Sequence, residues 1–310
     1  MLWEVAGLDE RELERLGALA GASVASAWPA LGDELVAMAG AAGVEPSLLW
    51  AVNARTELLG GDGECSLIGR LDGARATIAQ NWDWHPELAA SRVLWTVEER
   101  GRWFTTFTEA GMLAKVGVND RGLACGLNFL SSSLDGGVDG MPVHVLLRLV
   151  LQECGSLVDA MRLLLAARTS ASACVTLAGA ERAGAGLVAI ELSPGGPVVV
   201  WPGADGVLVH TNHFLGTLPA GHDLEPAERP GTLLRRDRLA ALVAGGAADR
   251  DALACHFPAA EPVCRHDDQD VAWADRRATL LSLVLDPRAP SFEVAADPPC
   301  EGEYERVPLP

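Results

Sequence analysis

One cysteine differs from the other six in its sequence surroundings. Cys65 directly follows a glycine-rich segment, residues 58–64, and stands at the first position of a run with strand character. The glycines predict an exposed loop, so the thiol at its end is placed differently from a cysteine in an apolar segment. We therefore take Cys65 as a candidate nucleophile. A structural role is the alternative at this point, because structural cysteines outnumber catalytic ones.

The remaining cysteines provide weaker candidates for chemistry. Seven cysteines with irregular spacing and no CxxC pair do not favour a disulfide framework. Cys255, His256, Cys264 and His266 are of the types that bind zinc, and they lie close together in the sequence. However, adjacent ligands rarely point to one tetrahedral centre, and the usual two-residue spacer is missing. We set this group aside and expect no metal and no other cofactor.

The composition excludes several classes of protein. The chain has 310 residues, of which 49% are hydrophobic and 21% charged, as in a globular protein. Its net charge of -18 would repel nucleic acids and anionic lipids. The first residues are acidic where a secretory signal needs basic ones, and no apolar run approaches the roughly 18 residues of a membrane span. We expect a cytoplasmic protein without nucleic-acid or membrane partners.

The sequence pattern predicts helices first and strands from Cys65 onward. Two helices are expected between Asp9 and Gly43, broken at Trp28-Pro29, and a third begins at Pro46. Strands 65–70 and 74–82 flank a hairpin signal, Asp72-Gly73. Further strands are expected at 92–97, 103–108, 113–118, 123–129, 173–178, 187–192, 197–201, 206–211, 278–285 and 292–295, with helices at 142–153 and 156–167 and within 231–257.

The order of these elements indicates the fold class. Groups of strands are joined by tight turns rather than by single alternating helices, which favours antiparallel sheets covered by helices over a parallel, doubly wound sheet. The GxGxxG and GxxxxGK[ST] patterns of nucleotide-binding proteins are absent from the sequence. We expect one layered α+β domain with an N-terminal helical segment.

Five short strings, in this order, resemble the isopenicillin N acyltransferase family of Ntn (N-terminal nucleophile) hydrolases. They are Cys65-Ser66, AQNWDW at 79–84, NDRG at 119–122 with Asn128, HTNHF at 210–214 and CRH at 264–266. Thr279-Leu280 and a final Pro-Cys at Cys300 add to the likeness, which spans most of residues 45–310. The resemblance implies a four-layer αββα sandwich and a precursor that cuts its own Glu64–Cys65 bond. Residues 1–64 would be the helical fragment released by this cut, and 65–310 the catalytic domain.

The resemblance also implies a reaction. A cysteine at a new chain start carries its own general base, because an α-amino group has a pKa of about 7.7 to 8.0. The implied enzyme is an amidohydrolase or acyltransferase of secondary metabolism that forms an acyl-thioester on Cys65. Its partners would be a small acyl amide, or an acyl donor and an amine acceptor. We allow for a homodimer.

Site roles are implied position by position. Asn212 matches the asparagine that stabilises the oxyanion, a task for which a neutral amide donor is suited. Asp83 matches the aspartate that orients the new amine or binds a polar group of the substrate. Arg265 matches an arginine suited to a substrate carboxylate. For Arg55 and Glu57, just before the cut, we expect a structural ion pair.

Four further side chains are assigned structural roles. His210 and His213 would lie on opposite faces of a strand, which argues against a shared metal. Trp82 and Trp84 alternate with Asp83, so both indoles should share one face and line either the core or a pocket.

The sequence departs from the family pattern at the cut. The founding member has glycine before the cysteine where this chain has Glu64, and Ser66 stands where threonine is common. Glycine tolerates strained backbone geometry better than glutamate does. The alternative reading is an unprocessed, non-catalytic ligand-binding member of the same fold.

Overall fold

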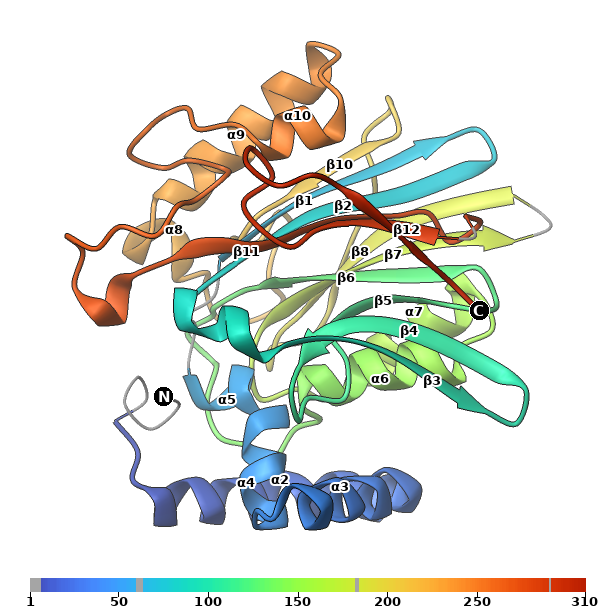
Figure 1. Ribbon diagram of the computed structural model, residues 1–310, viewed down its shortest axis with the longest axis vertical. Helices are drawn as coiled ribbons and strands as arrows, with labels where there is room; N and C mark the ends of the chain where they lie inside the picture. The colour runs from blue at the N-terminus through green and yellow to red at the C-terminus, as the bar shows by residue number, and fades with distance from the viewer. Residues whose placement is uncertain (1–6, 60–63, 182–183, 290) are drawn as a thin grey trace.

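Among the residues that the structure describes, four helices precede the first strand. The computed structural model describes residues 7–59, 64–181, 184–289 and 291–310 (Figure 1). The Asp9 carboxylate accepts a hydrogen bond from the Glu12 N–H at 2.8 Å and so begins the first helix. Trp28-Pro29 separates the first two helices, as expected. The helices are α2 (Glu10–Ala27), α3 (Pro29–Ala42), α4 (Pro46–Asn53) and α5 (Arg55–Leu59).

The predicted hairpin carries the candidate nucleophile. It consists of β1 (Glu64–Asp72) and β2 (Arg75–Trp84), and Gly73 in its turn has a φ of 54°. Cys65 pairs with Trp82, and Glu64 pairs with Asp83. Because side chains alternate between the two faces of a sheet, Cys65 and both tryptophans share one face, as predicted for the tryptophans. Asp83 points to the other face. Of the predicted loop before Cys65, residues 60–63 lie outside the described residues.

The hairpin lies within a six-stranded antiparallel sheet ordered β10-β1-β2-β11-β12-β13. The C-terminal strand β13, which the sequence pattern did not predict, pairs with β12 at the sheet edge. The other four strands are β10 (Val207–His210), β11 (Ala278–Leu285), β12 (Ser291–Ala295) and β13 (Glu305–Pro308).

A second antiparallel sheet has seven strands, and neighbours in this sheet also follow one another in the sequence. The turns between neighbouring strands are short in its first half, and two helices separate β6 from β7. The strands are β3 (Arg92–Glu99), β4 (Arg102–Glu109), β5 (Val116–Asn119), β6 (Leu123–Phe129), β7 (Ala173–Glu181), β8 (Gly184–Leu192) and β9 (Val198–Val200).

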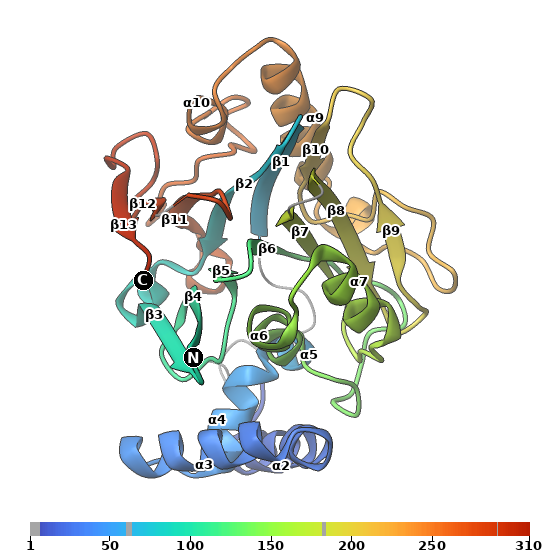
Figure 2. The ribbon, with the colours of Figure 1, turned by 90° about the vertical axis from the view of Figure 1, so that its right-hand side faces the viewer.

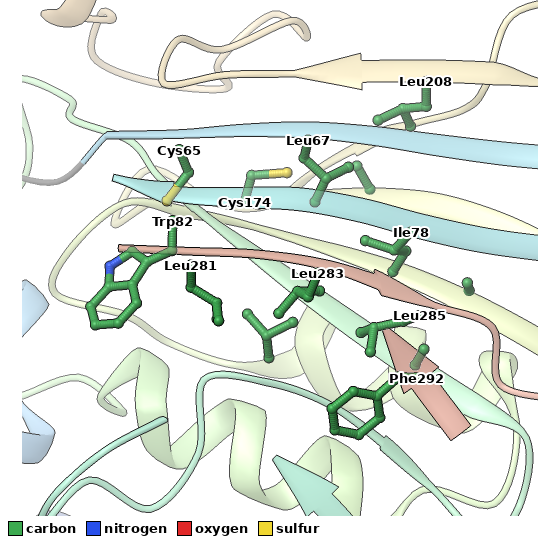
Figure 3. Close-up of a cluster of buried hydrophobic side chains, with 14 of the residues drawn as sticks. Cys65, Leu67, Ile78, Trp82, Cys174, Leu208, Leu281, Leu283, Leu285 and Phe292 are labelled. Atoms are coloured by element: carbon green, nitrogen blue, oxygen red, sulfur yellow. The ribbon is translucent and has the colours of Figure 1, made fainter. Parts of the chain in front are cut away.

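Helices cover the outer faces of the packed sheets (Figures 1 and 2). Apolar side chains such as Leu67, Ile78 and Leu283 fill the space between the sheets (Figure 3). Separate apolar clusters join the seven-stranded sheet to α6 (Val143–Glu153) and α7 (Leu157–Ala166), and the six-stranded sheet to α9 (Gly231–Ala244) and α10 (Asp249–Leu253). Shorter elements are α8 (Glu225–Glu228), η1 (Pro86–Ser91) and η2 (Trp273–Asp275). The predicted four-layer αββα sandwich is therefore confirmed.

The N-terminal helices pack against the sandwich at α6. Leu35 and Leu49 share an apolar cluster with Val145 and Leu149 of α6. The buried Asn53 side chain donates to the Gly111 carbonyl at 2.8 Å and accepts from the Leu113 N–H at 2.8 Å. Within the described residues no single helix is both long and apolar enough to cross a bilayer, and α3 and α4 meet those criteria only as a pair bent by 116°.

Candidate active site

Cys65 lines a pocket between the two sheets. Cys65 is 7% exposed, and its side chain lies on the same face of the sheet as that of Trp82 (Figure 3). The empty space at this pocket, including the part that is open to solvent, is about 500 Å³. Most of its wall is apolar. It is lined by Arg55, Thr56, Leu59, Cys65, Gln80, Trp82, Trp84, Lys115, Val116, Leu127, Phe129 and His144.

A buried trio of charges forms the polar part of the pocket. The Glu109 carboxylate binds both cations, with 2.6 Å from its Oε1 to Arg55 Nη2 and 2.6 Å to Lys115 Nζ. Burial alone would raise the pKa of Glu109, but the charges of Arg55 and Lys115 lower that pKa well below its usual range. Burial lowers the pKa of Lys115 to about 8. Lys115 Nζ lies 3.5 Å from the centre of the Trp82 ring, so this ammonium also has a cation–π contact.

The thiol of Cys65 is held in its neutral form. Burial raises the pKa of Cys65 to about 12, and the nearby negative charge of Asp83 adds to the effect, while Lys115 and Arg235 oppose it. At neutral pH the thiol of the uncut chain therefore keeps its proton. Attack on a carbonyl needs a base that removes this proton as the reaction proceeds.

Asn212 contacts the main chain of Cys65. Its Oδ1 accepts hydrogen bonds from the Cys65 N–H at 3.0 Å and from Arg235 Nη2 at 3.0 Å. Its Nδ2 donates to the Phe129 carbonyl at 3.0 Å. Two donors at the same oxygen define which end of the amide faces the cysteine. In the uncut chain Asn212 thus presents an acceptor to Cys65, whereas the oxyanion role needs its donor end.

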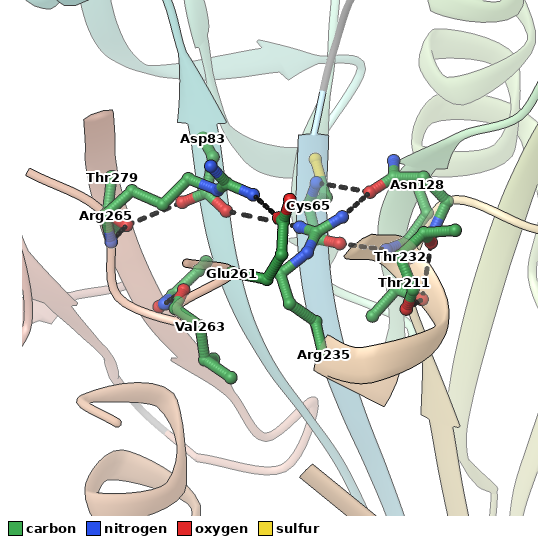
Figure 4. Close-up of polar contacts among 12 residues, drawn as sticks. Cys65, Asp83, Asn128, Thr211, Thr232, Arg235, Glu261, Val263, Arg265 and Thr279 are labelled. Carbon is green, nitrogen blue, oxygen red and sulfur yellow. Dashed lines mark hydrogen bonds and ion pairs between the residues drawn. The ribbon is translucent and has the colours of Figure 1, made fainter. Parts of the chain in front are cut away.

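Asp83 belongs to the same network from the opposite face of the hairpin. It is fully buried, and its Oδ1 accepts a hydrogen bond from the Thr279 hydroxyl at 2.6 Å. Its Oδ2 lies 4.0 Å from Arg235 Nη1. Arg235 reaches from α9 toward both Asp83 and the start of β1 (Figure 4). The structure therefore brings Cys65, Asp83 and Asn212 together, as the motifs predicted, through an arginine that they did not include.

Comparison with known proteins decides the family. A family model described as acyl-coenzyme A:6-aminopenicillanic acid acyl-transferase matches residues 70–232. The chain belongs to this family. A relative from Emericella nidulans, the 40 kDa form of acyl-coenzyme A:6-aminopenicillanic-acid-acyltransferase, is 27% identical over 273 residues, which are 84% of this chain and 72% of the relative.

Solved structures of other proteins are similar to this chain. A Caenorhabditis elegans ortholog of N-acylethanolamine-hydrolyzing acid amidase matches 79% of this chain and 100% of its own, with 16% identity and a TM-score of 0.54. Penicillin V acylase from Agrobacterium tumefaciens matches 79% and 86% of the two chains, with 13% identity and a TM-score of 0.47. The fold is that of the Ntn hydrolases, and the family that the chain matches is one of acyltransferases. A non-catalytic member of the fold is not favoured.

The side chain of Arg265 does not line the pocket. Its Nη2 binds Glu261 Oε2 at 2.8 Å. Its main-chain N–H donates to the Thr279 hydroxyl at 2.9 Å, and so supports the residue that binds Asp83. Arg265 thus lies beside Asp83 (Figure 4), and its binding of a substrate carboxylate stays a prediction.

Sequence reasoning missed Arg235, Lys115 and Glu109. Arg235 is 1% exposed although it sits in a helix with several charged residues, so its burial had no signal in the local pattern. The motif that includes Asn128 did point to the site. Asn128 Nδ2 donates to the carbonyls of Cys65 and His210, both at 3.3 Å.

The two histidines of the HTNHF string have separate partners, and His213 lies beyond the end of β10 instead of on the opposite face of the same strand. His210 Nε2 lies 2.9 Å from Glu191 Oε1, and both side chains are fully buried. Burial opposes protonation of His210, yet Cys174 and Glu191 together raise its pKa to about 10. His213 Nδ1 instead lies 3.1 Å from the Thr232 hydroxyl.

The expected ion pair between Arg55 and Glu57 is wrong. Arg55 pairs with Glu109, 54 residues away, while Glu57 Oε1 accepts the Val143 N–H at 3.0 Å at the start of α6. Glu57 Oε2 has no hydrogen-bond partner among the described residues. Burial therefore raises the pKa of Glu57 to about 7.

The raised pKa of Glu57 predicts that the folded protein loses stability as the pH rises. An unfolded glutamate loses its proton near pH 4.5, whereas folded Glu57 keeps its proton up to about pH 7, so the stabilisation present below pH 4.5 is lost as the pH rises through 7. Between pH 5 and 8, the free energy of unfolding should fall by roughly 1–3 kcal/mol more than in a Glu57→Gln variant. Denaturant titrations of both proteins, in an uncut Cys65→Ala background, measure this difference. Parallel pH profiles would contradict it.

Proposed function

We propose that Cys65 is the nucleophile of an amidohydrolase or acyltransferase whose substrate is a small acyl amide. The thiol attacks the acyl carbonyl, its proton goes to the leaving amine, and an acyl-thioester remains on Cys65. Water or an acceptor amine then releases the acyl group. One observation carries the proposal: the Cys65 side chain faces a mainly apolar pocket while its main-chain nitrogen is held by Asn212.

Self-cleavage of the Glu64–Cys65 bond would create the general base. The thiol attacks the Glu64 carbonyl, the bond to the Cys65 nitrogen breaks, and water hydrolyses the resulting thioester. The freed α-amine has a usual pKa of about 7.7 to 8.0, so part of it is unprotonated at neutral pH and can accept the thiol proton while the sulfur attacks the carbonyl. Asn212 Oδ1 already accepts from this nitrogen, and so would orient the new amine. Asp83 would support the same arrangement through Arg235.

The contacts of the N-terminal segment favour a fragment that stays bound after the cut. Arg55, Thr56 and Leu59 line the pocket, and Arg55 makes a buried ion pair with Glu109. Loss of the segment would leave Glu109 with only one of its two cations and expose an apolar helix interface. We therefore propose that residues 1–64 and 65–310 form one two-fragment enzyme, in place of the released fragment that the family resemblance implies.

The pocket wall indicates an apolar acyl group. Leu59, Val116, Leu127 and Phe129 surround the space that leads to Cys65. Each methylene transferred from water to such a wall contributes about 0.8 kcal/mol. In a series of N-acyl amines with one common amine, kcat/KM should rise about fourfold per added methylene until the pocket is full. A Val116→Phe variant should reach its maximum at a shorter chain. A flat dependence on chain length would contradict an acyl pocket here.

The decisive experiment detects the thioester. Purified protein is analysed by intact mass for the fragments 1–64 and 65–310, and is then mixed with a panel of N-acyl amines under acid quench. We expect the mass of fragment 65–310 to increase by the acyl group, with the modification on Cys65. Adding an acceptor amine separates the two activities, because a transferase gives a new amide while a hydrolase gives the free acid. Turnover without any modification of Cys65 would overturn the proposal.

A further inference from the structure

Four metal-ligand side chains from distant segments meet at the surface of the six-stranded sheet. His256 follows α10, Cys264 and His266 precede β11, and Cys300 lies between β12 and β13. One ligand atom from each residue lies within 4.8 Å of every other. Chain segments up to 44 residues apart are thus brought to one point, and each contributes a thiol or an imidazole.

Four of the six distances between these atoms lie within about 0.4 Å of the distances in a zinc tetrahedron. With Zn–S of about 2.3 Å and Zn–N of about 2.0–2.1 Å, ligand atoms lie about 3.8 Å apart for two sulfurs, 3.6 Å for sulfur and nitrogen, and 3.3 Å for two nitrogens. Here the two sulfurs are 3.5 Å apart, and His256 Nε2 and His266 Nε2 are 3.0 Å apart. His266 Nε2 lies 3.2 Å from Cys300 Sγ and 4.0 Å from Cys264 Sγ.

The surroundings orient these ligands. Glu301 Oε1 lies 3.4 Å from His266 Nδ1, a carboxylate–histidine contact that leaves Nε2 facing the cluster. The loop between His256 and Cys264 is closed at its base, because the Cys255 carbonyl accepts the N–H groups of Val263 and Cys264 at 3.0 Å each. This closure holds the two ends of the loop side by side.

A buried asparagine of the hairpin supports the same loop. Asn81 Nδ2 donates to the carbonyls of Leu253 and Val263, at 2.9 Å and 3.1 Å. Asn81 belongs to the AQNWDW string and lies two residues before Asp83. The loop that carries the ligands is therefore anchored to the strand that carries the catalytic network.

We propose that His256, Cys264, His266 and Cys300 bind one Zn²⁺ in a closed Cys₂His₂ site. Two thiolates and two imidazoles form the donor set that zinc prefers in such sites. Four protein ligands leave no position for substrate, so the role is structural. The ion would connect the C-terminal segment to the loop before β11.

The zinc site would also position part of the active site. Arg265 lies between two of the ligands, its N–H donates to the Thr279 hydroxyl, and that hydroxyl donates to Asp83. Zinc would hold residues 264–266, and with them Thr279, in place behind Asp83.

This proposal revises the expectation of no metal. Cys255 is not one of the ligands, in line with the objection that the adjacent residues Cys255 and His256 would rarely point to one metal. Its Sγ instead accepts hydrogen bonds from Arg238 Nε and the Phe257 N–H, both at 3.5 Å. The fourth ligand is Cys300 instead. No local spacing in the sequence could indicate it, because 34 residues separate Cys300 from His266.

The test uses the full chain, purified without a histidine tag or chelator. Elemental analysis should find about one zinc per chain in the wild type and in a Cys255→Ser control, and at least tenfold less in a Cys264→Ser/Cys300→Ser variant. Cobalt added to the zinc-depleted wild type and control should give the absorption bands of a tetrahedral thiolate site. Absence of both zinc and cobalt binding in the wild type, or full zinc content in the double variant, would overturn the proposal.

A second measurement does not depend on the folding of any variant. Wild-type protein is alkylated with iodoacetamide with and without added Zn²⁺, and the cysteine-containing peptides are quantified by mass spectrometry. Zinc should slow alkylation of Cys264 and Cys300 at least tenfold and leave Cys255 unchanged. Equal protection of all three cysteines, or a Cys264–Cys300 disulfide in freshly isolated protein, would overturn the proposal.

Discussion

The Cys65→Ala variant is expected to remain one uncut chain of 32.5 kDa and to lose turnover by roughly 10⁴-fold or more. Alanine removes the sulfur that would attack both the Glu64 carbonyl and the substrate acyl group. No other cysteine lines the pocket, so none of them is placed to replace it. Intact mass measures the cut, and release of amine from an N-acyl substrate measures turnover.

Cys125→Ala is the matched control for this prediction. Cys125 is fully buried in the apolar cluster between the seven-stranded sheet and its helices, away from the pocket. Its loss removes a similar thiol from the core and should leave cutting and turnover within a few-fold of wild type. Turnover at the wild-type rate in Cys65→Ala would rule out the thioester mechanism. A Cys65→Ala chain that still cuts itself would rule out the proposed self-cleavage.

The Asn212→Ala variant is expected to lose about 10²–10³-fold in kcat. The substitution removes the acceptor of the Cys65 nitrogen and a partner of Arg235, and it removes the amide that would donate to an oxyanion. Removing one such donor from an acyl-transfer site has an effect of this size. The measurement is kcat on an N-acyl amine, with the extent of cutting determined on the same sample.

Asn212→Asp separates the two roles of this side chain. Aspartate keeps an oxygen for the Cys65 nitrogen and for Arg235 but has no amide hydrogen to donate. If Asn212 stabilises the oxyanion, the two variants should lose kcat to a similar extent. If Asn212 acts only as an acceptor, Asn212→Asp should keep most of the activity, which would contradict the oxyanion role.

Asn119→Ala serves as the control for the loss of a buried asparagine. Asn119 Nδ2 donates to the carbonyls of Leu151 and Cys154, both at 3.0 Å, and so stabilises the fold away from the pocket. This variant should have a lower Tm while the folded protein keeps its kcat. A loss of kcat as large as in Asn212→Ala would mean that Asn212 acts only through stability.

Local signals in the sequence predicted most elements of the fold. The Asp72-Gly73 turn located the β1–β2 hairpin, and Trp28-Pro29 located the break between α2 and α3. Alternation along β2 placed Trp82 and Trp84 on one face, where both line the pocket. These predictions were right because backbone geometry at turns and the two-residue period of a strand depend on near neighbours. The short α5, α8 and β13 were missed because they depend on contacts with other elements.

The sequence by itself determined the candidate nucleophile, the motifs that accompany it and the layered fold. Each of these depends on the types of residues at a few neighbouring positions. Only the tertiary structure decided which side chains contact one another. Arg55 binds Glu109 instead of Glu57, Arg235 joins Asp83 to Asn212, and Cys300 completes the cluster around His266. These pairings join positions more than 20 residues apart, and their strength depends on burial in a low-dielectric interior, which no local pattern encodes.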